Sequence, residues 1–202
     1  HAAEIYNYYK EQGWKYQQYI ACLDPLGEDR GKTPYALNPE QYGMFLTELF
    51  NLWYEDWKKG EQPYIRQFEN YIGILLGYQP ESCEQRGSCG IQNVVEADGS
   101  VYPCDFYALD EYKLGNFNCN RLEEIDKKRK EIAFVEQSQI VAENCKNCKF
   151  YKICKGGCRR NKDFNAMNGE YENYFCKSYR IFFDICLERM IQIVEIIKNQ
   201  KG

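Results

Sequence analysis

The feature that most constrains this chain of 202 residues is a series of closely spaced cysteines. Its eight members are Cys83, Cys89, Cys104, Cys145, Cys148, Cys154, Cys158 and Cys176. From Cys145 to Cys158 the intervening segments are two, five and three residues long. Such spacings let one loop or helical turn bring several thiolates together, as a polynuclear metal centre requires. Eight thiols are enough for two tetrathiolate sites, and only Cys22, Cys119 and Cys186 lie outside the series.

Metal ligation explains these cysteines better than disulfide bonding does. The total of 11 cysteines is odd, and the first residues lack the pattern of a signal peptide, so we expect a cytoplasmic protein with free thiols. Because the only histidine is His1, mixed Cys/His zinc sites and histidine-based acid–base chemistry are not expected. Iron–sulfur and tetrathiolate zinc sites both remain open. The single Cys-x2-Cys knuckle favours iron–sulfur, since paired structural zinc sites usually have two.

The net charge of −4 is unevenly distributed along the chain. The segment 145–162 contains no acidic residue, and its basic residues are Lys146, Lys149, Lys152, Lys155, Arg159, Arg160 and Lys162. Such a segment can bind nucleic acid, or it can offset the negative charge of a buried thiolate cluster. The basic residues alternate with thiols, so we favour the second interpretation and predict no nucleic-acid partner. No run of about 18 apolar residues exists, so no membrane association is expected.

The first 77 residues have the pattern of one α/β unit. The helices expected here span residues 1–12, 38–60 and 65–76. Asn38 is a good N-cap and Pro39 suits the first helical position. Residues 16–23 are expected to form a buried parallel strand because their apolar run is nearly continuous. One strand cannot form a sheet, so we expect its neighbours to precede His1.

The rest of the chain is expected to be rich in loops. An Asp98-Gly99 pair between alternating apolar residues predicts a β-hairpin over residues 93–102. A charged helix is expected from Leu122 to Phe134. A long amphipathic helix should begin at Cys176, and the apolar stripe on this helix is best explained by core packing.

The cysteine series and its flanks resemble a known protein family. The series is similar to the seven-cysteine SPASM signature of radical S-adenosylmethionine enzymes. The matching positions are, in order, Cys89, Gly99-x4-Cys104, the four cysteines spaced from Cys145 to Cys158, and Cys176. Further matching segments are Cys83, Pro103-Cys104-Asp105-Phe106-Tyr107, Leu114-Gly115-Asn116 and Gly156-Gly157-Cys158-Arg159. These make the chain resemble one branch of that group, the anaerobic sulfatase-maturating enzymes.

This resemblance implies a fold made of two parts. Residues 1–77 would be the last helix, strand and helices of a partial (β/α) barrel, the radical SAM partial TIM barrel, which is an α/β structure. Residues 78–202 would be a SPASM auxiliary-cluster domain, a loop-rich α+β module with a β-hairpin and a C-terminal helix. A monomer is expected.

The resemblance also implies how the thiols are shared between two auxiliary 4Fe–4S clusters. The first cluster would be held by Cys83, Cys89, Cys104 and Cys158. The second would be held by Cys145, Cys148, Cys154 and Cys176. A complete set of four thiolates leaves no open iron for a reactant, so such clusters transfer electrons.

One motif of the family is absent from this sequence. Radical S-adenosylmethionine enzymes bind their cofactor on a third 4Fe–4S cluster held by Cys-x3-Cys-x2-Cys. The nearest match is Cys154-x3-Cys158, but the next required position is Asn161. We therefore expect S-adenosylmethionine and the third cluster to be bound mainly by a missing N-terminal half. The 202-residue chain alone should not cleave the cofactor.

The resemblance gives two further residues a role. Asp105 would accept a proton when a Cys or Ser side chain in a sulfatase peptide is oxidised to Cα-formylglycine under anaerobic conditions. Leu23 would contact the adenosine part of S-adenosylmethionine. From the residues alone, Asp105 would be a turn or cap residue and Leu23 a buried leucine at a strand end. The expected partners are the sulfatase peptide and an electron donor such as flavodoxin or ferredoxin.

Two other functions remain open at this point. One is another SPASM enzyme that modifies peptides by forming thioether or carbon–carbon crosslinks. The other is a zinc-stabilised basic module that binds a partner. Asp105 and eight cluster-forming thiols favour sulfatase maturation, but the sequence does not decide between Cys-type and Ser-type sulfatases.

Overall fold

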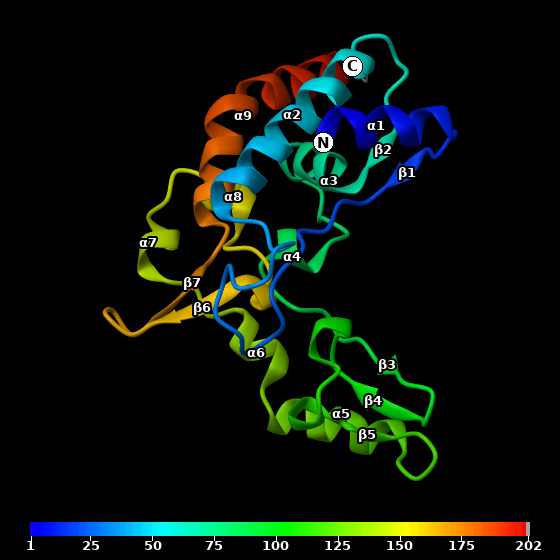
Figure 1. Cartoon of the computed structure of the whole chain (residues 1–202), viewed down its shortest axis with the longest axis vertical. Helices are drawn as coiled ribbons and strands as arrows, with labels where there is room; N and C mark the ends of the chain where they lie inside the picture. The colour runs from blue at the N-terminus through cyan, green and yellow to red at the C-terminus, as the bar shows by residue number, and fades with distance from the viewer. Residues whose placement is uncertain (201–202) are drawn as a thin grey trace.

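The computed structural model describes residues 1–200 of the chain. It contains helices and short strands, and its long axis separates two regions (Figure 1). Helices α1, α2, α3 and α9 form one region, and the strands β3, β4 and β5 with helix α5 form the other. No helix within residues 1–200 combines the length and the apolar character needed to cross a bilayer.

The first region begins with a helix–strand–helix–strand–helix order. Its elements are α1 (Ala2–Glu11), β1 (Tyr16–Gln17), α2 (Pro39–Trp57), β2 (Tyr64–Ile65) and α3 (Arg66–Leu75). The Asn38 side chain accepts a hydrogen bond from the backbone N–H of Gln41, and the Gln41 side chain accepts one from the backbone N–H of Asn38. This capping box confirms the predicted start of the second helix. All three predicted helices in this part of the chain are present.

The predicted strand over residues 16–23 is much shorter than expected. Only Tyr16 and Gln17 form a strand, which pairs in parallel with Tyr64 and Ile65. The parallel direction is confirmed, but the prediction of a buried strand over residues 16–23 is wrong, because Gln17 is the one buried residue in this range and Tyr16 is 84% exposed. The expectation that every neighbouring strand precedes His1 is also wrong, since β2 follows within the chain. The partner strand, β2, is only two residues long, so it has no further backbone N–H and C=O groups with which β1 could pair beyond Gln17.

The second region is built around the predicted hairpin. After the short helix α4 (Cys83–Arg86) come β3 (Val94–Val95), β4 (Ser100–Tyr102) and β5 (Gly115–Asn116), which form an antiparallel sheet in that order. The hairpin around Asp98-Gly99 is confirmed, whereas β5 was not predicted. The charged helix predicted from Leu122 to Phe134 is present as α5 (Leu122–Glu131) but ends earlier, and a separate short helix, α6 (Phe134–Ser138), follows it. The break falls where Ala133 takes a left-handed backbone conformation, φ 48°.

The remaining elements carry the last cysteines. They are α7 (Glu143–Lys146), α8 (Tyr151–Cys154), β6 (Lys162–Asn165), β7 (Glu170–Asn173) and α9 (Cys176–Asn199). The antiparallel hairpin of β6 and β7 projects from the body of the molecule and was not predicted (Figure 1). The long helix that begins at Cys176 is confirmed.

The main hydrophobic core lies between α2, α3 and α9. Phe182 of α9 is fully buried, and its ring centroid lies 5.8 Å from that of Phe68 and 5.9 Å from those of Phe50 and Tyr71. Aromatic pairs at such distances add to the stabilisation that comes from burial. A smaller core of Val101, Leu114 and Ile125 stabilises the second region.

We predict that Phe182→Ala destabilises the protein strongly. Removing a fully buried phenylalanine leaves a cavity and costs about 3–5 kcal/mol of unfolding free energy. The matched control is Ile185→Ala on the same helix, because Ile185 is 53% exposed and should change stability by less than about 1 kcal/mol. Denaturant titration followed by circular dichroism measures both, and equal effects would contradict the assigned core.

Candidate metal centres and adjoining cavity

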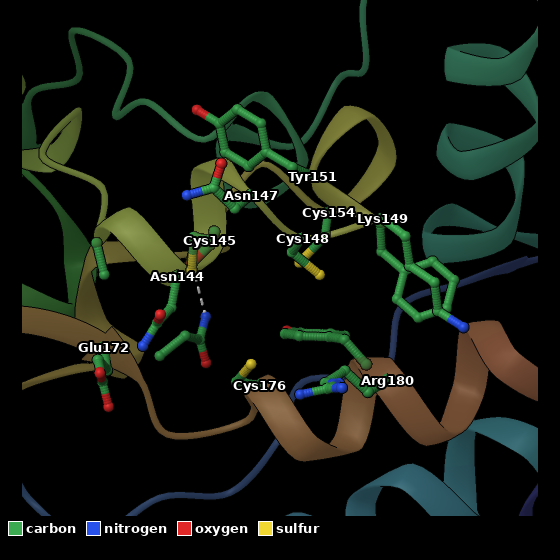
Figure 2. A pocket seen from close by; sticks show the side chains of 15 residues that line it. Asn144, Cys145, Asn147, Cys148, Lys149, Tyr151, Cys154, Glu172, Cys176 and Arg180 are labelled. Carbon is green, nitrogen blue, oxygen red and sulfur yellow. Dashed lines mark hydrogen bonds between the residues drawn. The ribbon is translucent and has the colours of Figure 1, made fainter.

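Four cysteines from three helices and one turn line one cavity of about 480 Å³. They are Cys145, Cys148, Cys154 and Cys176, contributed by α7, the turn after it, α8 and the first residue of α9. Figure 2 shows these cysteines arranged around the same space, with Arg180 and Glu172 at its margin. This is one of the two thiol sets implied by the family resemblance, and we call it the second set.

The other four cysteines, which we call the first set, come from more distant segments. Cys83, Cys89 and Cys158 line a small cavity together with Ser138. Cys104 does not line this cavity, but the Cys89 thiol is among the groups that raise its pKa. The backbone N–H of Cys89 donates to the Ser138 Oγ atom at 2.8 Å. Cys158 lies in the turn before the 3-10 helix η3 (Arg159–Asn161), and its sulfur accepts from the backbone N–H of Arg160 at 3.4 Å.

The thiols that influence one another's pKa values fall into the same two sets. Burial, with the thiols of Cys176 and Cys145, raises the pKa of Cys154 to about 12. Burial also raises the pKa of Cys158, and Cys83 and Cys89 add to this effect. Among the cysteines with raised pKa values, every contributing thiol belongs to the same set. In the structure, three thiols of the first set line one cavity, and all four thiols of the second set line another.

Each set supplies four thiols, which is the number that completes the thiolate shell of one 4Fe–4S cluster. Among residues 1–200, no three His, Cys, Asp or Glu side chains are close enough to hold one metal ion. A tetrathiolate zinc site needs four sulfurs at about 2.3 Å from one ion. In a cubane each thiolate binds a different iron, so the sulfurs lie farther apart. Metal ligation requires the thiolate form, so binding of a cluster would displace the protons that burial retains on these thiols.

Asp105 and Leu23 line the same cavity, although 82 positions of sequence separate them. This cavity of about 500 Å³ also includes Phe106 and Arg160. A neighbouring cavity of about 410 Å³ contains Asp105, Leu23, Cys83 and Cys158. Asp105 begins the 3-10 helix η1 (Asp105–Tyr107) and is exposed. The predicted carboxylate and the predicted cofactor-contacting leucine thus face a common space beside the first set.

Asp105 also contacts its neighbouring thiol. The Cys104 sulfhydryl donates to the Asp105 Oδ1 atom at 3.1 Å. Burial and this hydrogen bond raise the pKa of Cys104 to about 12. A thiolate bound to a metal has no proton to donate, so ligation of Cys104 would release this carboxylate oxygen toward the cavity.

The loop that carries Leu23 is held by the buried side chain of Asp24. Its carboxylate accepts from the Thr33 Oγ1–H at 2.7 Å, from the Thr33 N–H at 2.8 Å and from the Gly31 N–H at 2.7 Å. These hydrogen bonds, the Thr33 side chain first among them, lower the pKa of Asp24 to about 2. Arg160 also donates to the Asp24 carbonyl oxygen.

A second connection joins this loop to the cluster region. Arg30 forms a bidentate ion pair with Asp163, at 2.7 and 2.9 Å, and donates to the Arg160 carbonyl at 3.1 Å. No sequence pattern assigns a role to Arg30 or Asp163. The two residues are 133 positions apart, so no local pattern could have paired them.

The basic segment divides into exposed and inward-facing residues. Lys146 and Lys149 form surface ion pairs with Glu143 and Asp184. Arg159 instead lies over the ring of Phe134, 4.5 Å from its centroid, and donates to the Phe134 carbonyl at 2.8 Å. The segment is therefore not one continuous basic surface.

Comparison with known proteins shows which proteins this chain is similar to. Residues 83–149 match the SPASM family model, described as an iron-sulfur cluster-binding domain. A cysteine-type anaerobic sulfatase-maturating enzyme of Clostridium perfringens is 44% identical over 198 residues, which are 98% of this chain and 54% of that protein. A serine-type enzyme of Bacteroides thetaiotaomicron is 29% identical and is covered to 51%.

The similarity extends to three-dimensional structure. A solved structure of native anSMEcpe with bound AdoMet and Cp18Cys peptide matches 98% of this chain and 55% of that chain, with 43% identity and a TM-score of 0.89. The predicted resemblance to anaerobic sulfatase-maturating enzymes is confirmed. The chain spans about half the length of the curated relatives it matches.

We predict that Asp24→Ala loosens the loop that carries Leu23. The substitution removes three hydrogen bonds to the carboxylate, so the amides of Gly31 and Thr33 should exchange hydrogen several-fold faster. Asp29→Ala is the control, because Asp29 is exposed and forms one surface ion pair with Lys32. Hydrogen exchange followed by NMR or mass spectrometry tests this, and unchanged protection in Asp24→Ala would refute the role of its carboxylate.

Proposed function

We propose that this chain is part of a radical S-adenosylmethionine enzyme that oxidises a Cys or Ser side chain of a sulfatase peptide to Cα-formylglycine under anaerobic conditions. The observation that carries the proposal is the placement of Asp105 and Leu23 on one cavity beside the first set of thiols. The 44% identity to a cysteine-type relative favours cysteine as the target over serine.

In this proposal each thiol set holds one auxiliary 4Fe–4S cluster. Cys83, Cys89, Cys104 and Cys158 hold the first. Cys145, Cys148, Cys154 and Cys176 hold the second. When bound, two fully ligated clusters supply a route for electrons, since neither has an open coordination position. The match of residues 83–149 to an iron-sulfur cluster-binding domain supports the assignment.

The role proposed for Asp105 is to remove a proton from the substrate side chain. A carboxylate is a far weaker base than a thiolate, so it does not deprotonate a resting thiol readily. Loss of a Cβ hydrogen makes the remaining S–H or O–H far more acidic, so a nearby carboxylate can then accept its proton. The exposure of Asp105 at the cavity leaves it accessible to a peptide.

Leu23 is proposed to contact the adenosine part of S-adenosylmethionine. The parallel pair of β1 and β2 is consistent with residues 1–77 being the end of a partial (β/α) barrel. Leu23 follows β1 on the side where barrel enzymes place their ligands. Residues 78–202 would then be the auxiliary-cluster domain. A sulfatase peptide and a flavodoxin or ferredoxin remain the proposed partners.

We predict that single cysteine substitutions remove one cluster at a time. Cys148→Ala should lose the second cluster and Cys89→Ala the first, each with a loss of about four iron atoms per chain. Cys119→Ala is the matched control, since Cys119 is exposed and belongs to neither set. Iron analysis of anaerobically purified protein decides this, and full iron retention in either ligand variant would refute the grouping.

We predict that Asp105→Asn separates proton removal from the earlier steps. In the complete enzyme this nearly isosteric change should preserve both auxiliary clusters and cofactor cleavage. Formylglycine formation should fall by about 10²–10⁴-fold, the usual contribution of a general base. The decisive quantity is formylglycine formed per 5′-deoxyadenosine released, measured by mass spectrometry.

The control for that experiment is Asp110→Asn. Asp110 begins the next 3-10 helix, η2 (Asp110–Tyr112), and does not line the cavity of Leu23 and Asp105. An unchanged product ratio in Asp105→Asn would eliminate the base role. Loss of iron in this variant would make Asp105 a support for the Cys104 turn instead.

A further inference from the structure

Lys162 binds a segment of chain, residues 138–142, whose ends line the cavities of the two thiol sets. It is the first residue of β6, and its side chain is partly buried. The ammonium Nζ donates to the carbonyl oxygens of Ser138 at 2.8 Å and Ile140 at 3.0 Å. Both carbonyls lie at or just beyond the C-terminal end of α6, where a cation is favourably placed.

The segment that Lys162 holds connects the two cavities. At one end, Ser138 lines the cavity of the first set, and its Oγ accepts from the Cys89 N–H. At the other end, Ala142 lines the cavity of the second set, and its carbonyl accepts from the Cys145 N–H at 3.0 Å. The ammonium is therefore fixed along a stretch of chain whose two ends each contact one set.

We propose that Lys162 is a positioning residue that supplies positive charge to both candidate clusters and stabilises their reduced states. The role rests on the proposed function, which places a cluster in each set. Each electron that a cluster accepts adds one negative charge. A cation held nearby in a partly buried position favours that charge more than a solvated one does.

The electrostatics of Lys162 agree with this position. Burial lowers its pKa, while the Cys145 thiol of the second set and the Cys89 and Cys158 thiols of the first set act in the opposite direction. The contributing thiols come from both sets, in agreement with the hydrogen bonds that place the ammonium on the segment between them.

The test is a redox titration followed by electron paramagnetic resonance. It uses the anaerobically purified protein that contains this chain, in Cys89→Ala and Cys148→Ala backgrounds that each retain one auxiliary cluster. Lys162→Met should lower the midpoint potential of the remaining cluster in both backgrounds, so the ratio of reduced to oxidised cluster at a fixed potential falls several-fold. Lys162→Arg keeps the positive charge and should therefore have the midpoint potential of the unsubstituted lysine. Lys130→Met is the control, because Lys130 is an exposed lysine of α5.

Lys162→Gln separates the charge from the hydrogen bonds, since an amide still donates to carbonyls. If Lys162→Met loses iron, the midpoint potentials are measured on Lys162→Gln instead. This variant should show the same lowered midpoint potentials. Unchanged potentials with full iron, or a shift in only one background, would overturn the shared role. Absence of iron from both sets in the unsubstituted protein would instead overturn the proposed function.

Discussion

The close crossing of α2 and α9 is the constraint on which the rest of the structure depends. A Cβ atom at Gly43 would lie 3.1 Å from the backbone of Ser178, so only glycine allows this approach without movement. The Ser178 hydroxyl also donates to the Pro39 carbonyl at 2.6 Å. Cys176 is two residues away, at the first position of α9. The packing of the main core therefore determines where this thiol of the second set lies.

The first set depends on a different kind of support. Its thiols come from segments that span 75 positions of sequence, from Cys83 to Cys158, and the nearest sheet has strands of two or three residues. Short strands and a three-residue core stabilise little by themselves. Metal binding to buried thiols couples directly to folding, because ligation releases protons and joins distant segments. Cluster binding would thus complete a region that its own apolar contacts hold only weakly.

Local patterns predicted the parts of the fold that local physics determines. The Asn38-Pro39 helix start, the Asp98-Gly99 hairpin and the apolar stripe of α9 each depend on residues close in sequence, and each is confirmed. The length of β1 depends on a partner almost 50 positions later, so the pattern overestimated it. At the candidate site, spacing indicated a metal centre, but the grouping of the thiols came from family resemblance. The Arg30–Asp163 pair had no sequence signal.

The basic segment illustrates why charge along a sequence differs from charge in space. Its inward-facing members all donate to backbone carbonyls of distant segments. Arg159 bonds to the Phe134 carbonyl, Arg160 to that of Asp24, and Lys162 to those of Ser138 and Ile140. Carbonyls accept hydrogen bonds without neutralising a cation, so each residue can tie a segment to the Cys158 turn and still retain its positive charge beside the thiols. A nucleic-acid phosphate would need these groups at the surface. Their engagement with the backbone directs their charge toward the protein interior.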